Sequence, residues 1–122
     1  MPRVIQFQIS ADDPERVAKF YTDVFGWQIQ QFGDMEYWNV VTGTDEDDGP
    51  GINGGIFLRK GLVGHVNVVA VDDIDAYQEK VLAAGGEIAL PKMAIPGVGY
   101  IMYVKDTEQS IVGITQLDMT VY

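Results

Sequence analysis

The sequence contains no cysteine and a single histidine, His65, among its 122 residues. Without cysteine the chain has no disulfide, no thiolate nucleophile and no cysteine metal ligand. This fits a cytoplasmic protein, which is the location we expect. Basic residues are scarce as well, because 8 Lys and Arg stand against 18 Asp and Glu and give a net charge of −10. Such a surface repels phosphate backbones and anionic lipid, so we expect no nucleic-acid and no membrane partner.

Serine and phosphate-binding motifs are also poorly represented. Ser10 and Ser110 lie outside any strand–elbow–helix context, which disfavours a serine hydrolase. The glycine-rich stretch 49–55 lacks the Lys-Ser/Thr pair of a phosphate loop. The acidic run 45–48 lacks the spaced oxygen ligands of a calcium loop, so we interpret it as a solvated loop.

A repeat with a period of sixty residues is the strongest pattern that the sequence does contain. Asp12-Asp13 follows a β-like run in the first half, and Asp72-Asp73 follows another in the second half. Asp13 and Asp73 are each suited to cap a helix. Glycine ends both helical segments, at Gly26 and at Gly86. A repeat of this size predicts two similar structural units with a ligand site where they face each other.

Hydrophobic periodicity fills in the elements of each unit. Alternation of apolar and polar residues in 4–9 predicts a half-buried strand, and an apolar stripe at i, i+3, i+4 and i+7 predicts a helix after Asp13. Further strands are expected at 27–32, 36–42, 54–58, 65–71, 87–90, 99–104 and 111–116, with a second helix after Asp73. The order is βαβββ twice, an α+β fold in a single domain of two modules, 1–60 and 61–122, with the hinge around Gly61.

At this point the residues resemble a known family. The stretch 11–27, ADDPERVAKFYTDVFGW, looks like the first module of the vicinal oxygen chelate superfamily, the group of glyoxalases, bleomycin-resistance proteins and extradiol dioxygenases. The segments 71–75 and 91–100 are similar to the second module of small glyoxalase-like members, and the turn at Asp106 resembles their last hairpin. The resemblance implies two βαβββ modules around a cavity, and in many members a divalent metal held by four side chains.

The metal-ligand positions of that family hold unsuitable residues here. Carried over one by one, they fall on Gln6, on Val66, on Gly113 and near Gly54 or Gly55. Valine and glycine offer no ligand atom, and imidazole and carboxylate are the donors that such metals prefer. We therefore expect no metal site and no cofactor. His65 lies one residue before a ligand position, so strand alternation leaves it as a structural or rim residue, a ligand-binding or acid–base group, or a metal contact through a bulge.

The candidate ligand-binding residues are polar or aromatic side chains on the expected strands. Gln6 and Gln8 share one strand face, opposite the face that packs on the helix. Apolar walls with a few placed amides and hydroxyls are typical of small-molecule sites. The candidates are Gln6, Gln8, Trp38, Asn53, Asn67, Tyr100, Met102 and Gln116, although Trp38, Tyr100 and Met102 could equally belong to the core or to a dimer interface.

Three functions remain open from the sequence. The first is a metal-free, glyoxalase-like protein that binds an organic small molecule in the cavity between the modules. The second is a lyase or isomerase that uses Tyr100, His65 or Glu36 as its acid–base group. The third is a non-catalytic interaction domain. In each case we expect a homodimer, since C2 dimers are the commonest oligomers.

The last turn, at Asp106, gives a prediction about backbone conformation. Where the family commonly has Gly-Asn after the acidic residue of the last turn, this chain has Gln109-Ser110. If the backbone is unchanged, Gln109 adopts a left-handed conformation at a cost of about 1 kcal/mol.

Overall fold

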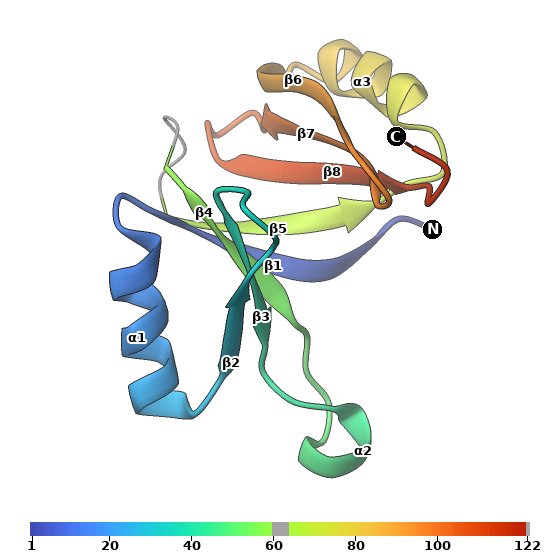
Figure 1. The fold of residues 1–122 in the computed structure, drawn as a ribbon. Coiled ribbons are helices and arrows are strands. Elements are labelled where there is room, and N and C mark those ends of the chain that lie inside the picture. Colours follow the sequence, from blue (N-terminus) through green and yellow to red (C-terminus); the bar gives the residue numbers. More distant parts are fainter. Residues whose placement is uncertain (60–63, 122) are drawn as a thin grey trace. The chain divides into compact units, whose positions relative to one another are not determined.

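The computed structural model describes residues 1–59 and 64–121. Its elements follow the predicted order, with one short helix added (Figure 1). They are β1 (Arg3–Ala11), α1 (Pro14–Phe25), β2 (Gln28–Gln31), β3 (Tyr37–Val41), α2 (Asp45–Asp48), β4 (Gly54–Leu58), β5 (His65–Ala70), α3 (Ile74–Ala83), β6 (Glu87–Ile95), β7 (Gly99–Lys105) and β8 (Ile111–Leu117). The α+β fold of two βαβββ modules is therefore confirmed.

The chain divides into two compact units. The first unit is Gln6–Val66, and the second unit combines Met1–Ile5 with Asn67–Tyr122. The boundary predicted between residues 60 and 61, and the hinge at Gly61, lie outside the described residues.

In the first unit four strands form a mixed sheet in the order β2-β3-β4-β1. β1 runs parallel to β4, whereas β2, β3 and β4 pair antiparallel. α1 covers one face of this sheet (Figure 1). Ile9, Val40 and Ile56 form the buried core there, and half-buried residues of α1, including Val17 and Tyr21, pack against it.

The ends of α1 match its sequence signals. The Asp13 carboxylate accepts a hydrogen bond from the Arg16 backbone N–H at 3.1 Å, and Pro14 stands at the start, where its missing N–H costs nothing. Gly26 ends the helix with a left-handed φ of 75°. Trp27 then stacks on Tyr21, with 5.0 Å between ring centroids, which ties the start of β2 to the helix.

The second unit repeats this plan. Its strands have the order β5-β8-β7-β6, with β5 parallel to β8. α3 packs on one face, where Ile74, Met102, Val104 and Ile114 form a buried core. The Asp73 side chain caps α3 by accepting from the Ala76 N–H at 3.2 Å. No helix of the described residues is long and apolar enough to cross a membrane.

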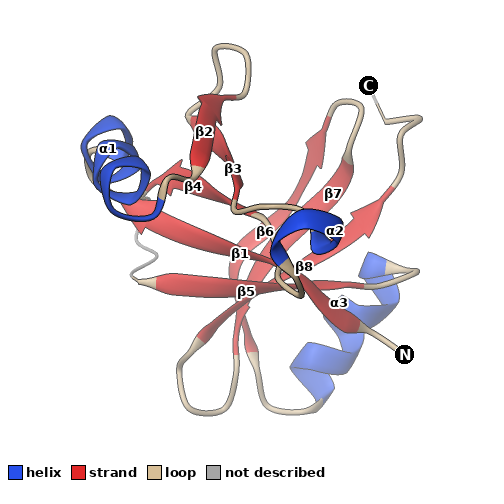
Figure 2. Cartoon of the chain, turned by 90° about the horizontal axis from the view of Figure 1, so that it is seen from below, coloured by secondary structure: helices blue, strands red, loops and turns tan. Residues whose placement is uncertain are grey.

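Two segments differ from the sequence predictions. The acidic run 45–48 forms a helical turn, α2, instead of an open loop (Figure 2), because the Thr44 hydroxyl accepts from the Asp47 N–H and the Asp48 carboxylate accepts from the Thr44 N–H. β6 continues to Ile95 instead of ending at 90. Register shifts in its pairing with β7, between Ile88 and Met93, accommodate Pro91 within the strand.

Candidate functional site

A row of side-chain amides crosses the sheet of the first unit on the side away from α1. The pairing register places Gln8 opposite Gly55, Gly55 opposite Asn39, and Asn39 opposite Gln30. Laterally paired residues point to the same face of a sheet. Because Phe7 and Ile9 face α1, alternation directs Gln8 and its row to the other face. We call this side of the sheet the amide face, and it carries Gln6, Gln8, Gln28, Gln30, Asn39 and Tyr37.

Tyr37 connects this row to the neighbouring one. The Gln8 side-chain N–H group donates to the Tyr37 hydroxyl oxygen at 3.4 Å, and Gln8 is only 2% exposed. The hydroxyl lies directly over Gly55, where any Cβ would overlap it. Gly55 is therefore required for this position of the ring. In the bond to Gln8 the phenol oxygen is the acceptor, so its own O–H proton is not used by this contact.

The amide face has no formal charge. Among the described residues that β1 to β4 of the first unit direct to this side, none is Asp, Glu, Lys, Arg or His. Tyr37 is its one ionisable group. Burial raises the pKa of the Tyr37 phenol above its ordinary value, and the hydrogen bond from Gln8 offsets part of that rise. The phenol is thus neutral at physiological pH, and the surface offers donors and acceptors without charge.

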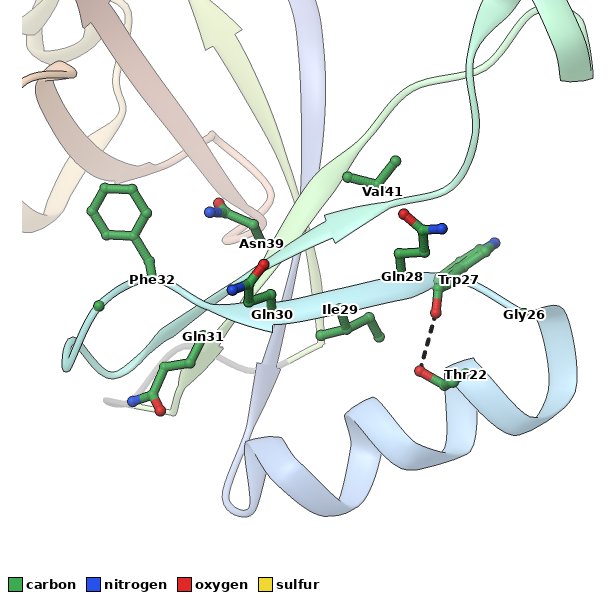
Figure 3. A pocket seen from close by; sticks show the side chains of 11 residues that line it. Thr22, Gly26, Trp27, Gln28, Ile29, Gln30, Gln31, Phe32, Asn39 and Val41 are labelled. Carbon is green, nitrogen blue, oxygen red and sulfur yellow. Dashed lines mark hydrogen bonds between the residues drawn. The ribbon is translucent and has the colours of Figure 1, made fainter.

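A pocket of about 870 Å³ lies next to this row, along β2 (Figure 3). Gln28, Gln30, Asn39 and Val41 line it from the amide face, and Trp27 and Ile29 line it from the side of α1. Its remaining lining residues are Thr22, Gly26, Gln31, Phe32 and Gly33. Most of its lining residues are exposed, so the pocket is an open groove, with the half-buried Trp27 and Ile29 as an apolar wall beside several side-chain amides.

The residues at the family's metal-ligand positions do not fit a catalytic cation. A Cβ at Gly54 would overlap the Phe7 carbonyl oxygen, so a ligating side chain at that position would require β1 to shift. A Cβ at Gly113 would lie 3.1 Å from the Val68 side chain, in a buried apolar environment. The residues that the structure describes contain no group of three or more His, Asp or Glu that could hold a metal ion.

Several predicted binding residues already have structural partners within the fold. Trp38 packs in the α1-side core, on the opposite face from Gln8, and Met102 is fully buried in the core of the second unit. The Gln116 side-chain oxygen accepts the Ile74 N–H at 2.9 Å and so caps α3. The Asn53 side-chain oxygen accepts from the Thr42 N–H at 2.9 Å. Asn67 is exposed on β5.

The three acid–base candidates lie on separate elements. His65 is the exposed first residue of β5, and Glu36 is exposed immediately before β3. Tyr100 belongs to the second unit, where it packs against the α3-side core with the Lys92 ammonium 5.0 Å from its ring centroid. None of the three is among the described residues that β1 to β4 direct to the amide face.

The residues that sequence reasoning missed are Tyr37, Asn39, Gln28 and Gln30. Polar alternation in 28–31 is weak, since Gln occupies three of its four positions. The adjacent Gly54-Gly55 pair was the available signal, because glycines within a strand often mark the close approach of another group. Here that group is the Tyr37 hydroxyl.

Comparisons with known proteins agree on one family. Residues 3–43 match the family model described as bleomycin resistance protein-like N-terminal. A glyoxylase-like domain-containing protein of Didymella fabae is 32% identical over 113 residues, which cover 83% of each chain. The CFP32 proteins of Mycobacterium bovis and Mycobacterium tuberculosis are 26% identical over 128 residues, and the match covers 88% of this chain but only 43% of theirs. The chain thus spans less than half the length of these relatives.

Among solved structures, the fold is similar to a glyoxalase/bleomycin resistance protein/dioxygenase superfamily member from Vibrio splendidus 12B01. The TM-score is 0.65 at 17% identity, over 97% of this chain and 100% of that one.

Proposed function

We propose that this chain, which belongs to the glyoxalase/bleomycin-resistance/dioxygenase superfamily, binds an uncharged organic molecule on the amide face of its first unit. The observation that carries the proposal is the row in which the exposed amides of Asn39 and Gln30 continue from the buried Gln8, with the Tyr37 hydroxyl held over Gly55. Primary amides both donate and accept hydrogen bonds. A ligand with a mixture of donors and acceptors and an apolar body suits this surface and the apolar walls of the adjacent pocket.

The charge distribution supports a neutral ligand over an anionic one. The chain carries a net charge of −10, and the amide face has no cationic group among its described residues. An anion would meet an unfavourable long-range field without a local partner to offset its desolvation. A neutral molecule avoids both costs.

Binding is better supported than catalysis. Tyr37 is the sole ionisable residue that the described strands direct to the amide face, and its raised pKa makes it a poor base near neutral pH. A lyase or isomerase activity through Tyr100, His65 or Glu36 therefore stays a prediction from the sequence, without a contact that favours it.

Benzamide and benzoate provide a matched test, because they differ mainly in charge. Saturation-transfer NMR should detect benzamide bound to the natural chain and no comparable signal for benzoate. Gln30→Leu should weaken benzamide binding roughly fivefold to tenfold, the value of about one hydrogen bond. Gln78→Leu changes the same residue type on α3, at a position that does not line the pocket, so it should leave binding unchanged. Equal binding of benzoate, or equal effects of the two variants, would contradict the proposal.

A further inference from the structure

Phe32 extends the amide face beyond the end of β2. Its backbone N–H donates to the Tyr37 carbonyl at 2.8 Å and so continues the pairing of β2 with β3 by one residue. Because side chains alternate along a strand, Phe32 points to the same side of the sheet as Gln30. Figure 3 shows both side chains on that side, together with Asn39. Phe32 lines the pocket and is 37% exposed, so it presents an apolar surface beside the amides.

The residues that the structure describes include no aromatic ring in contact with Phe32. Four further aromatic residues of the first unit contact one another around α1: Phe20, Tyr21, Phe25 and Trp27. Tyr37 is opposite Phe32 but leans away from it, since the Tyr37 hydroxyl lies over Gly55 on β4, and β3 separates β4 from β2. The ring of Phe32 is therefore open to a ligand in the pocket.

The turn after β2 fixes the backbone of Phe32. The Met35 N–H donates to the Phe32 carbonyl at 3.1 Å, and the Gln31 side-chain N–H group donates to the Met35 carbonyl at 2.8 Å. Gly33 turns the chain directly after Phe32 with a left-handed φ of 60°. Both backbone hydrogen-bonding groups of Phe32 are thus used, and a ligand that packs on its ring has less conformational freedom to remove.

Gln30 and Asn39 form a pair of amides next to Phe32. They lie directly opposite each other on β2 and β3, which places their Cβ atoms about 5 Å apart. Within the described part of the chain, neither side-chain amide forms a hydrogen bond. A carboxamide has an acceptor oxygen beside donor N–H groups, so a ligand edge with a neighbouring donor and acceptor can bond to both. Asn and Gln bind the edge of adenine by this bidentate contact.

We infer that the amide face takes a flat aromatic ring with a carboxamide or lactam group on one edge. This inference rests on the proposed function and names its ligand class. The ring packs on Phe32, and the edge bonds to Gln30 and Asn39. Phe32 and Gln30 are two residues apart along β2, about 7 Å, which matches the length of one aromatic ring with its carboxamide. An aromatic ring gains more on Phe32 than an aliphatic ring of similar size, because ring pairs add to the burial of area.

Benzamide and cyclohexanecarboxamide test the aromatic requirement, because they share the carboxamide and have rings of similar size. In NMR titrations the natural chain should bind benzamide roughly threefold to tenfold more tightly. Phe32→Leu should remove this preference, and Phe32→Tyr should keep it. Phe20→Leu is the matched control, since Phe20 is an exposed phenylalanine on α1 that does not line the pocket, and it should also keep the preference. Backbone NMR spectra confirm that each variant is folded.

Equal binding of the two carboxamides to the natural chain would overturn the inference and leave the proposed function standing. So would a preference that survives in Phe32→Leu. A preference lost in Val41→Ala instead would place the ring on the other side of the amide pair, because Val41 lies opposite Gln28, and would likewise overturn it. If neither carboxamide bound at all, the proposed function would fail together with the inference.

Methyl benzoate and intermolecular NOEs test the polar edge and the orientation. Methyl benzoate keeps the ring and the carbonyl of benzamide but has no N–H, so it should bind the natural chain roughly fivefold to tenfold more weakly. NOEs should connect the ring protons of benzamide with the ring protons of Phe32. Equal binding of methyl benzoate, or NOEs from the benzamide ring to Phe20 and none to Phe32, would contradict the inferred arrangement.

Discussion

Gly54 and Gly55 are neighbours on β4, and their replacement by alanine should have very different costs. A Cβ at Gly54 would overlap the Phe7 backbone carbonyl on the paired strand β1, whereas a Cβ at Gly55 would overlap the Tyr37 hydroxyl. A carbonyl in a sheet moves only with its strand, but a tyrosine ring can turn about its side-chain torsions. We expect Gly54→Ala to lower the free energy of unfolding by about 3 kcal/mol and Gly55→Ala to lower it by about 1 kcal/mol, which are the two ends of the usual range for overpacking.

Urea unfolding measures both free energies, and Tyr37→Ala supplies the control. Without the Tyr37 ring, Gly55→Ala should cost almost nothing, while Gly54→Ala should cost as much as before. Gly55→Ala should also abolish benzamide binding, because the added Cβ displaces the Tyr37 ring. The displaced ring would lie either across the amide face or away from it. Equal losses of stability for the two glycine variants would refute this reasoning. So would a cost of Gly55→Ala that does not change when Tyr37 is removed.

Two further predictions concern a turn and a titration. Gln109 has φ 66°, so Gln109→Gly relieves a left-handed conformation worth about 1 kcal/mol, partly offset by the greater freedom of glycine in the unfolded chain. Thermal unfolding should show an equal or higher Tm for Gln109→Gly, and a clear decrease would show that the Asp106 turn has another role. Burial raises the pKa of Tyr37 in the folded chain, so the unfolded chain loses the phenol proton at a lower pH than the folded chain does. The free energy of unfolding of the natural chain should therefore fall, relative to that of Tyr37→Phe, as pH rises above about 10. If the free energies of unfolding of the two proteins changed in parallel with pH, the raised pKa of Tyr37 would be contradicted.

The fold followed from local signals that each act within a few residues. Asp13 and Gly26 mark the ends of α1 in the sequence, and both have the expected role in the structure. The left-handed conformation of Gln109, predicted from the last turn, is confirmed by its φ of 66°. The helical turn α2 was missed, because four adjacent acidic residues repel each other, and the side-chain bonds of Thr44 and Asp48 that help to stabilise the turn are not evident from the sequence.

The candidate site was harder to predict, because faces depend on strand register. Gln8 lies on the face opposite α1 as expected, since Phe7 and Ile9 alternate with it. On β3 both Tyr37 and Trp38 are aromatic, so alternation alone does not say which of them faces the helix. The pairing of Trp38 with Ile56 places it in the core and leaves Tyr37 for the amide face. That information lies in long-range pairing and not in the local sequence.

The most direct test of ligand binding on the amide face is the side-chain amide region of a ¹⁵N NMR spectrum during titration with benzamide. Each Asn and Gln gives its own NH₂ signals, so every residue of the row reports separately. We predict shifts for the exposed Gln30 and Asn39 that saturate together, with no change for Gln78 on α3 of the second unit. Saturable shifts confined to Gln31 or to the second unit, or no shifts at all, would contradict the account.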